Sequence, residues 1–187
     1  NSVESLYCNS IENFYTLKKN IILIDDIKSL EDFRFLLNSE SYKLLKPRSN
    51  LTILGKTCKF YNGIKTGDNK KFLSDKKISE KYIPVIRGRD FSKYTTISQS
   101  IFVLFDKKQL WSNHNEELLS VKPKILIRQT SDIIIATLDY TGFYPMDTIH
   151  MIYESEIELK VLLAILNSKV FNYLHKSLVP ETGKVFA

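Results

Sequence analysis

The chain has few cysteines, no long apolar run and no leader-like start, and each of these scarcities excludes a class of protein. Its 187 residues contain only Cys8 and Cys58, too few for a disulfide framework and without metal-ligand spacing. A reduced, cytoplasmic setting is therefore expected. No apolar run approaches the roughly 20 residues of a membrane-spanning helix. The start has neither a signal-peptide pattern nor an initiator Met, which indicates a piece of a longer protein.

Familiar catalytic motifs are also missing. Gly55-Lys-Thr57 is like the end of a phosphate-binding P-loop, but Asn50 stands where that motif needs its first glycine. The sequence has no Gly-x-Ser-x-Gly elbow and no glycine-rich dinucleotide loop. Its three histidines have no partner at metal-ligand spacing. We therefore expect no active site, no metal site, no cofactor and no small-molecule substrate in this chain.

One enzymatic alternative stays open. Asp147 with Glu158 and Lys160 is faintly similar to the acidic Glu-x-Lys arrangement of metal-dependent nucleases. Glu-x-Lys is common by chance, and Lys160 opens a stretch whose apolar stripe predicts an ordinary packed helix. A metal-dependent DNA nuclease fragment is thus the alternative function from the enzyme class.

What the chain does contain is an ordinary globular composition with an uneven charge. Hydrophobic residues make up 43% and charged residues 26%, and the net charge is +6. Residues 1–53 carry seven basic and seven acidic groups, residues 54–130 sixteen and seven, and residues 131–187 four and seven. The positive charge therefore lies in the middle segment. A localised basic surface indicates a polyanionic partner, although a merely soluble face has the same composition.

Periodicity predicts helices at both ends and strands between them. Residues 3–19 and 29–45 are predicted helices with a short strand at Ile21–Ile24 between them, and Pro47–Asn50 marks a subdomain boundary. Residues 156–178 form a predicted amphipathic helix with a break at Asn167-Ser168. The predicted strands of the second part are Leu51–Leu54, Cys58–Tyr61, Tyr82–Ile86, Ser100–Phe105, Lys124–Gln129, Ile133–Leu138 and Thr148–Tyr153.

The stretch Ile83–Tyr94 runs from an apolar strand into a glycine set between two arginines. Gly88 is a residue that tolerates φ > 0, so we expect a sharp turn that places Arg87 and Arg89 beyond the strand end. The chain has 22 lysines but only five arginines, and guanidinium allows planar bidentate recognition that ammonium does not. An ordinary exposed loop with solvated charges is the alternative interpretation.

Two other segments combine basic residues with hydrogen-bonding groups. Asn62–Phe72 is a glycine-punctuated loop with three lysines, suited to holding phosphates, while Asn69 could contact a base edge. In Lys122–Thr130, strand alternation places Lys124, Leu126 and Arg128 on one face. Arg128 and Gln129 are types that recognise guanine and adenine.

Several motifs then follow one another in a recognisable order. They are Gly63-Ile-Lys-Thr-Gly67 with Phe72, Pro84-x-x-Arg-Gly-Arg-Asp90 with Tyr94, Lys122-Pro-Lys-Ile125 with Arg128, Asp139-x-x-Gly142-x-Tyr144, and Leu162–Lys169 with Gly183-Lys184. Together they resemble the TaqI-like C-terminal specificity domain, the target recognition domain of amino-methylating DNA methyltransferases and type IIG restriction–modification enzymes. The resemblance covers roughly residues 51–187.

The resemblance implies an α/β (α+β) fold: a twisted, mostly antiparallel, β-rich domain over residues 51–187, truncated at its C-terminus. Periodicity adds N-terminal helices in residues 1–50 and a long C-terminal helix. Such a domain clamps double-stranded DNA against the methyltransferase domain of the same parent polypeptide. The chain has no adjacent prolines, so the family's catalytic Asn-Pro-Pro motif is absent. S-adenosylmethionine, and magnesium if the parent cleaves DNA, are expected in the missing catalytic part.

The favoured function is sequence-specific duplex DNA binding without turnover. Lys65, Lys70, Lys71 and Lys93 would hold phosphates, and Arg87, Arg89, Arg128 and Gln129 would contact base edges. Asn69 and Asp90 are supporting candidates. Asp90 alternatively orients Arg89 or caps the turn, and Phe91 and Tyr94 are expected in the core or as wedges. The predicted DNA-binding residues are Lys65, Thr66, Asn69, Lys70, Lys71, Arg87, Arg89, Asp90, Lys93, Lys124, Arg128 and Gln129. A basic module that binds RNA or an acidic protein is the third alternative.

Overall fold

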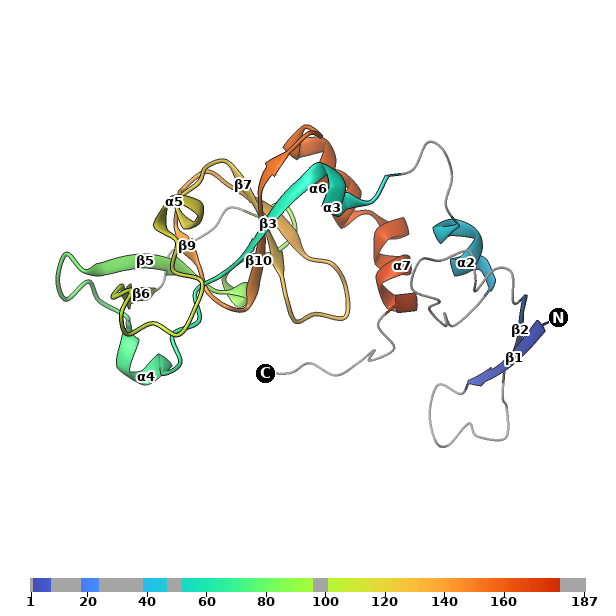
Figure 1. Cartoon of the computed structure of the whole chain (residues 1–187), viewed down its shortest axis with the longest axis horizontal. Coiled ribbons are helices and arrows are strands. Elements are labelled where there is room, and N and C mark those ends of the chain that lie inside the picture. The colour runs from blue at the N-terminus through green and yellow to red at the C-terminus, as the bar shows by residue number, and fades with distance from the viewer. Residues whose placement is uncertain (1, 8–17, 24–38, 47–51, 96–100, 179–187) are drawn as a thin grey trace. The chain divides into compact units, whose positions relative to one another are not determined.

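A computed structural model describes residues 2–7, 18–23, 39–46, 52–95 and 101–178 (Figure 1). The chain divides into two compact units. One contains Asn1–Thr52 and Tyr173–Lys184, and the other contains Ile53–Asn172 and Val185–Ala187. Each unit is described by itself below. Strands predominate, with short helices between and after them, which confirms the predicted α+β class.

The smaller unit contains a β-hairpin where the sequence predicted a helix. Strands β1 (Ser2–Tyr7) and β2 (Lys18–Leu23) pair antiparallel, so the prediction of a helix over residues 3–19 is wrong for its described residues. The short strand expected at Ile21–Ile24 is confirmed for Ile21–Leu23, which belong to β2, and Ile24 lies outside the described residues. Helix α2 (Ser39–Leu45) confirms only the end of the helix predicted over residues 29–45, whose first part lies outside the described residues.

Two four-stranded sheets form the larger unit. The first sheet is antiparallel, in the order β3 (Cys58–Asn62), β10 (Ile149–Ser155), β7 (Lys124–Arg128) and β8 (Ala136–Asp139). The second has the order β4 (Leu73–Ser74), β6 (Ile101–Leu104), β5 (Tyr82–Ile86) and β9 (Tyr144–Pro145), with only β5 and β9 parallel. Short helices α3 (Leu54–Thr57), α4 (Asn69–Phe72) and α5 (Glu116–Leu119) lie in the connections.

Buried apolar side chains hold each sheet to its covering elements. Ile64, Val85, Val103 and Met146 belong to a core beside the second sheet. A second core lies under α6 (Leu159–Asn167), where Leu162, Leu163 and Leu166 meet Ile125 and Ile152 of the first sheet. Burying a side chain of this size stabilises the fold by about 1.5–3 kcal/mol. The remaining core includes Ile86, Phe91, Leu126 and Met151, so it contains residues of both sheets.

Most strand predictions in this unit are confirmed, and two are corrected. The strands β3, β5, β6, β7 and β10 lie where the alternation predicted them. The end of the strand predicted at Leu51–Leu54 is instead the start of α3, with Leu51 outside the described residues. The strand predicted at Ile133–Leu138 begins only at Ala136, and β8 is an edge strand rather than a central one.

Helix side chains bond to the backbone at Ile134, just before β8, and at Ala136, its first residue. The backbone N–H of Ile134 donates to Asn172 Oδ1 over 2.8 Å. The N–H of Ala136 donates to Asn167 Oδ1 at 3.0 Å, and Asn167 Nδ2 donates to the Ala136 carbonyl at 2.9 Å. These amides satisfy backbone groups that another strand would otherwise have to pair.

The C-terminal helix is broken at the predicted place. Helix α6 ends at Asn167 and α7 (Lys169–Leu178) begins after Ser168. The apolar stripe packs as predicted in α6 but does not continue into α7, where the side chain of Val170 is 56% exposed and that of Tyr173 is 37% exposed. In the part of the chain that the structure describes, no helix is long and apolar enough to cross a membrane.

Candidate nucleic-acid interface

The short segment Pro145–Thr148 holds the three basic segments together. Its Pro145 carbonyl accepts the N–H of Ile64 at 2.7 Å, and the N–H of Asp147 donates back to the Ile64 carbonyl at 2.9 Å. The N–H of Met146 donates to Ile86 at 2.8 Å, immediately before Arg87. Thr148 accepts the N–H of Gly88 on Oγ1 and that of Gln129 on its carbonyl, each at 2.9 Å.

Two glycines allow these backbones to approach. A Cβ on Gly63 would lie 2.0 Å from the Met146 carbonyl oxygen, and one on Gly88 would lie 2.9 Å from the Thr148 carbonyl oxygen. Gly88 does not have a positive φ, since the glycines with that geometry among the described residues are Gly67 and Gly142. The expected reason for a glycine at position 88 is therefore wrong. Close backbone approach, not a left-handed turn, requires it.

Arg87 does not extend freely from the strand end. Its Nε and Nη2 donate to both carboxylate oxygens of Asp90 at 3.0 Å, and its backbone N–H donates to the same carboxylate at 2.9 Å. The Arg87 side chain is 23% exposed and that of Asp90 9%. Asp90 thus orients Arg87, not Arg89, and caps the 3-10 helix η2 (Gly88–Asp90). The pair positions the loop, and direct base contact by Arg87 is not supported by this arrangement.

Arg128 also has a structural use. Its Nε donates to the Gly88 carbonyl at 2.6 Å, and its Nη2 donates to the Phe91 carbonyl. The guanidinium lies over the ring of the buried Phe91, 5.8 Å from its centroid. Charge-assisted bonds of this kind are stronger than neutral ones. Arg128 therefore joins β7 to η2 through its Nε and Nη2 donors. Its predicted contact with guanine stays a prediction.

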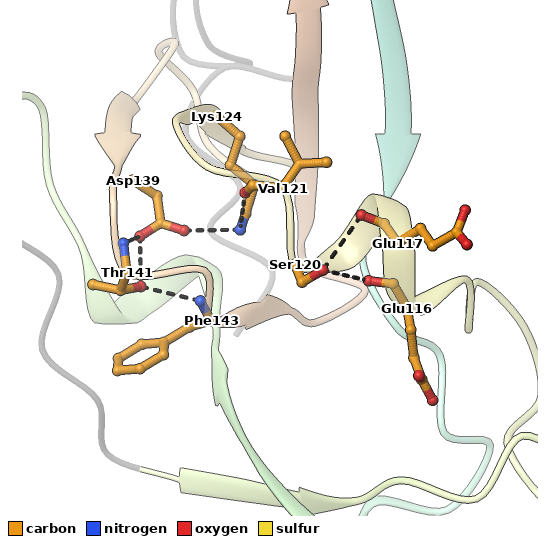
Figure 2. A network of polar contacts seen from close by, with 8 residues as sticks. All are labelled: Glu116, Glu117, Ser120, Val121, Lys124, Asp139, Thr141 and Phe143. Atoms are coloured by element: carbon orange, nitrogen blue, oxygen red, sulfur yellow. Dashed lines mark hydrogen bonds and ion pairs between the residues drawn. The ribbon is translucent and has the colours of Figure 1, made fainter.

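Lys124 is completely buried, so it is unavailable to DNA. Figure 2 shows its contacts with Asp139 and with the Val121 carbonyl. Its Nζ lies 2.9 Å from Asp139 Oδ2 and donates to the Val121 carbonyl at 2.9 Å. Asp139 also accepts the N–H and hydroxyl of Thr141 on Oδ1, at 2.8 and 2.6 Å. Burial lowers the pKa of Lys124, and the charge of Asp139 opposes that shift. Lys124 is half of a buried ion pair between β7 and β8, so it has no exposed surface for the DNA contact that was predicted for it.

The loop before α4 keeps its lysines exposed and uses its other polar groups internally. The hydroxyl of the buried Thr66 donates to Asn69 Oδ1 at 2.6 Å. Asp68 caps α4 by accepting the N–H groups of Lys70 and Lys71, at 3.0 and 3.2 Å. Thr66 therefore shapes the loop instead of contacting DNA, and the Asn69 carbonyl oxygen is already engaged. Gly67 supplies the positive φ, +82°, that the turn requires.

The side chains of residues 91–94 lie in different environments, from the buried Phe91 to the exposed Tyr94. Phe91 is buried as expected, but Tyr94 is 60% exposed and has a φ of 58°. Lys93 is half-buried and its Nζ donates to the Asn167 carbonyl at 3.1 Å, at the C-terminus of α6. That contact is favourable because a helix C-terminus is electronegative. Lys93 is thus committed to a structural bond.

Five of the predicted residues retain exposed polar ends. Within the described ranges, the side chains of Arg89, Gln129 and Lys70 form no hydrogen bond or ion pair. Lys71 Nζ donates to Gln109 Oε1 at 2.9 Å and remains exposed. Lys65 lies over Trp111, an exposed aromatic that the sequence analysis did not select. Trp111 is the single tryptophan of the chain, but its neighbours in space are far from it in sequence.

The geometry does not support the nuclease alternative. Asp147 precedes β10 and Glu158 follows it, so the seven residues of this strand separate them. A strand of that length spans about 20 Å. Glu158 caps α6 by accepting the N–H of Val161 at 3.1 Å. Among the residues whose placement is described, no group of three His, Cys, Asp or Glu could hold a metal ion.

The comparison with known families agrees with this picture of a binding domain. Residues 83–187, more than half of the chain, match the model of the TaqI-like C-terminal specificity domain. The chain belongs to this family. The predicted resemblance is confirmed over β5, η2 and all that follows, whereas the loop with Lys65 and Lys70 lies before the match. No curated protein matches the chain.

Membership in the TaqI-like specificity family supports a DNA-recognition role within a restriction–modification enzyme. The matched residues include Arg89 and Gln129, whose exposed side chains lie beside the Thr148 contacts described above.

Proposed function

We propose that this chain binds duplex DNA sequence-specifically, as the target recognition domain of a DNA amino-methyltransferase or type IIG restriction–modification enzyme. The observation that carries the proposal is the family match over residues 83–187. The surplus of nine positive charges in residues 54–130, sixteen basic less seven acidic, supports it, because phosphate contacts supply most of the affinity for DNA.

Within this proposal, Arg89 and Gln129 contact base edges. Both side chains are exposed, and the backbones next to them are joined through Arg128 and Thr148. An arginine pairs bidentately with guanine and a glutamine with adenine in the major groove. Rigid support matters here because base contacts need defined side-chain positions. Arg87, Asp90 and Arg128 supply that support through the hydrogen bonds that hold η2 in place.

Phosphate contacts fall to the exposed lysines Lys65, Lys70 and Lys71. These contacts set the register on the duplex and carry no sequence information. The recognition domain is proposed to extend from about residue 51, which the compact unit beginning at Ile53 supports.

The proposed partner within the parent polypeptide is a methyltransferase domain that grips the same DNA. S-adenosylmethionine, and magnesium if the parent cleaves, belong to that catalytic domain in this proposal. The chain has neither adjacent prolines nor a glycine-rich methyl-donor loop. The residues present here therefore do not fit a methyl-donor site, and we assign no chemical step to them.

Selection of binding sites from a randomised duplex pool tests the function. We expect a defined sequence to be enriched by the chain, alone or within its parent. Arg89→Ala should weaken binding by about 1–3 kcal/mol and relax one position of the selected site, whereas Lys70→Gln should weaken all duplexes alike. Enrichment of no sequence, or a preference for structured RNA at the same salt concentration, would contradict the proposal.

A further inference from the structure

Trp111 is an exposed aromatic whose position is set by the loop that carries Lys65. The N–H groups of Trp111 and Ser112 donate to the Lys65 carbonyl at 3.0 and 3.1 Å, and the N–H of Lys65 donates to Ser112 at 3.1 Å. The indole is nevertheless 68% exposed. An exposed tryptophan on a backbone held by three hydrogen bonds is suited to contact with a partner, because tryptophan is enriched at interfaces.

Lys65 covers the indole. Its Nζ lies 4.5 Å from the ring centroid, the geometry of a cation–π pair. Gly67 lies close to the same side chain, since a Cβ there would be 3.5 Å from Cβ and Cε3 of Trp111. With Lys65 over one face, the ring is poorly placed to insert between base pairs, which requires both faces. The indole N–H is a donor that has no acceptor among the described residues.

The segments around this pair carry more lysines than carboxylates: Lys65, Lys70, Lys71, Lys107 and Lys108 against Asp68, Asp106, Glu116 and Glu117. Asp68 caps α4 and Glu116 lies 3.3 Å from Lys107, and neither carboxylate forms an ion pair with Lys65. Asp106 accepts from the Lys108 N–H and the Gln109 side chain, which lowers its pKa. No ion pair between described residues includes Lys65 or Lys70. The charge around Trp111 therefore complements an anion.

We propose that Trp111 and Lys65 together hold one phosphate of the DNA backbone, the indole through its N–H and the lysine through its ammonium. This inference rests on the proposed function and adds Trp111 to its binding residues. The cation–π contact restricts Lys65 before DNA arrives, so less side-chain entropy is lost on binding. A phosphate contact positions the domain on the duplex and is indifferent to sequence.

Fluorescence of the single tryptophan tests the inference on the full chain. Titration with a duplex that contains the selected site should change the indole emission, because only Trp111 reports. Trp111→Phe keeps the ring and removes the donor, so it should lower affinity about fivefold for selected and random duplexes alike. Lys65→Gln should reduce the slope of log affinity against log salt by about 1. Lys169→Gln changes an exposed lysine at the start of α7 and is the matched control. It should reduce this slope less than Lys65→Gln does.

The outcomes of these experiments distinguish failure of the proposed phosphate contact from failure of the proposed DNA-binding function. Sequence-specific binding with unchanged indole emission and unchanged affinity of Trp111→Phe would overturn the phosphate contact and leave the proposed function standing. Loss of affinity for the selected duplex alone would also overturn it, since that result means base contact. Absence of duplex binding by the unaltered chain and its parent would remove the proposed function and this inference together.

Discussion

At the scale of single residues, the cations of the basic middle segment differ in what their charged ends contact. Lys124, Arg87 and Arg128 point into protein and bond to Asp139, Asp90 and backbone carbonyls. Arg89, Lys65 and Lys70 end in solvent. The first group contributes to stability and the second is available for a polyanion. Mutations in the first group should therefore lower the free energy of unfolding, whereas mutations in the second group should weaken DNA binding.

Lys124→Met should destabilise the protein. Removing one partner of a buried ion pair leaves the other charge uncompensated, which costs about 3–5 kcal/mol. Because Asp139 Oδ1 also holds Thr141, the double variant Lys124→Met/Asp139→Asn should recover part of that loss. Urea unfolding followed by circular dichroism measures both. Exposed Lys160→Met is the control, and equal stability of the two lysine variants would contradict the assignment.

Arg87→Ala should lower stability while leaving the selected base sequence unchanged. The change removes two charge-assisted bonds to Asp90 and leaves a mostly buried carboxylate without its cation, at a cost of about 1–3 kcal/mol. Thermal unfolding gives the first quantity and duplex selection the second. A changed base preference in a variant of normal stability would return Arg87 to the base-contacting group.

At the scale of elements, Pro145–Thr148 is the junction on which the candidate interface depends. Its bonds join the strand end before Arg87, the loop at Ile64 and the end of β7. These three places are far apart in sequence. Their backbones approach closely enough to exclude a side chain at Gly63 and Gly88.

Gly88→Ala should therefore disturb both stability and binding. The added Cβ would lie 2.9 Å from a backbone carbonyl oxygen and 3.2 Å from Arg128 Cγ, so the junction must shift, at a cost of about 1–3 kcal/mol. Gly55→Ala in α3 is the matched control, because nothing lies within 4 Å of its Cβ. The control should be neutral or stabilising by about 0.5–1 kcal/mol. Denaturant midpoints of the two variants check this, and equal midpoints would contradict it.

At the scale of the whole molecule, charge distribution governs how tightly any duplex is held. If Lys65, Lys70 and Lys71 each neutralise a phosphate, changing all three to Gln should reduce the slope of log affinity against log salt by about 3. Changing Lys59, Lys160 and Lys169 to Gln removes the same formal charge and should change the slope less. Binding titrations at several salt concentrations measure both, and equal slopes would indicate that charge alone, irrespective of place, drives binding.

The predictability of the fold depended on how local its signals are. Alternation placed β5 and β7 correctly because a strand with one buried face repeats every two residues. The break at Ser168 was equally visible. The helix predicted over residues 3–19 is wrong for its described parts, because these pair in a β-hairpin. Strand pairing can override a local helical pattern. The strand predicted from Ile133 begins only at Ala136. The N–H groups of Ile134 and Ala136 donate to asparagine side chains of the C-terminal helices and not to another strand, and the sequence alone does not show these contacts.

The candidate interface was less predictable for the same reason. Residue type alone grouped Arg87, Arg89 and Arg128 together, yet only Arg89 ends in solvent. Trp111 was not selected because its relation to Lys65 requires two loops to pair. Nothing in the spacing of a charged residue states whether a carboxylate or carbonyl will lie beside it after folding.

The sequence by itself determined the family, the strand-rich class and the place of the positive charge, since motif order, alternation and composition are properties of the unfolded chain. Only the tertiary structure decided which cations face solvent. Arg128 bonds a residue 40 positions away, and Lys124 meets Asp139 across two strands. A charge enters the interior only where folding supplies its partner, because an unpaired buried charge is too costly to keep.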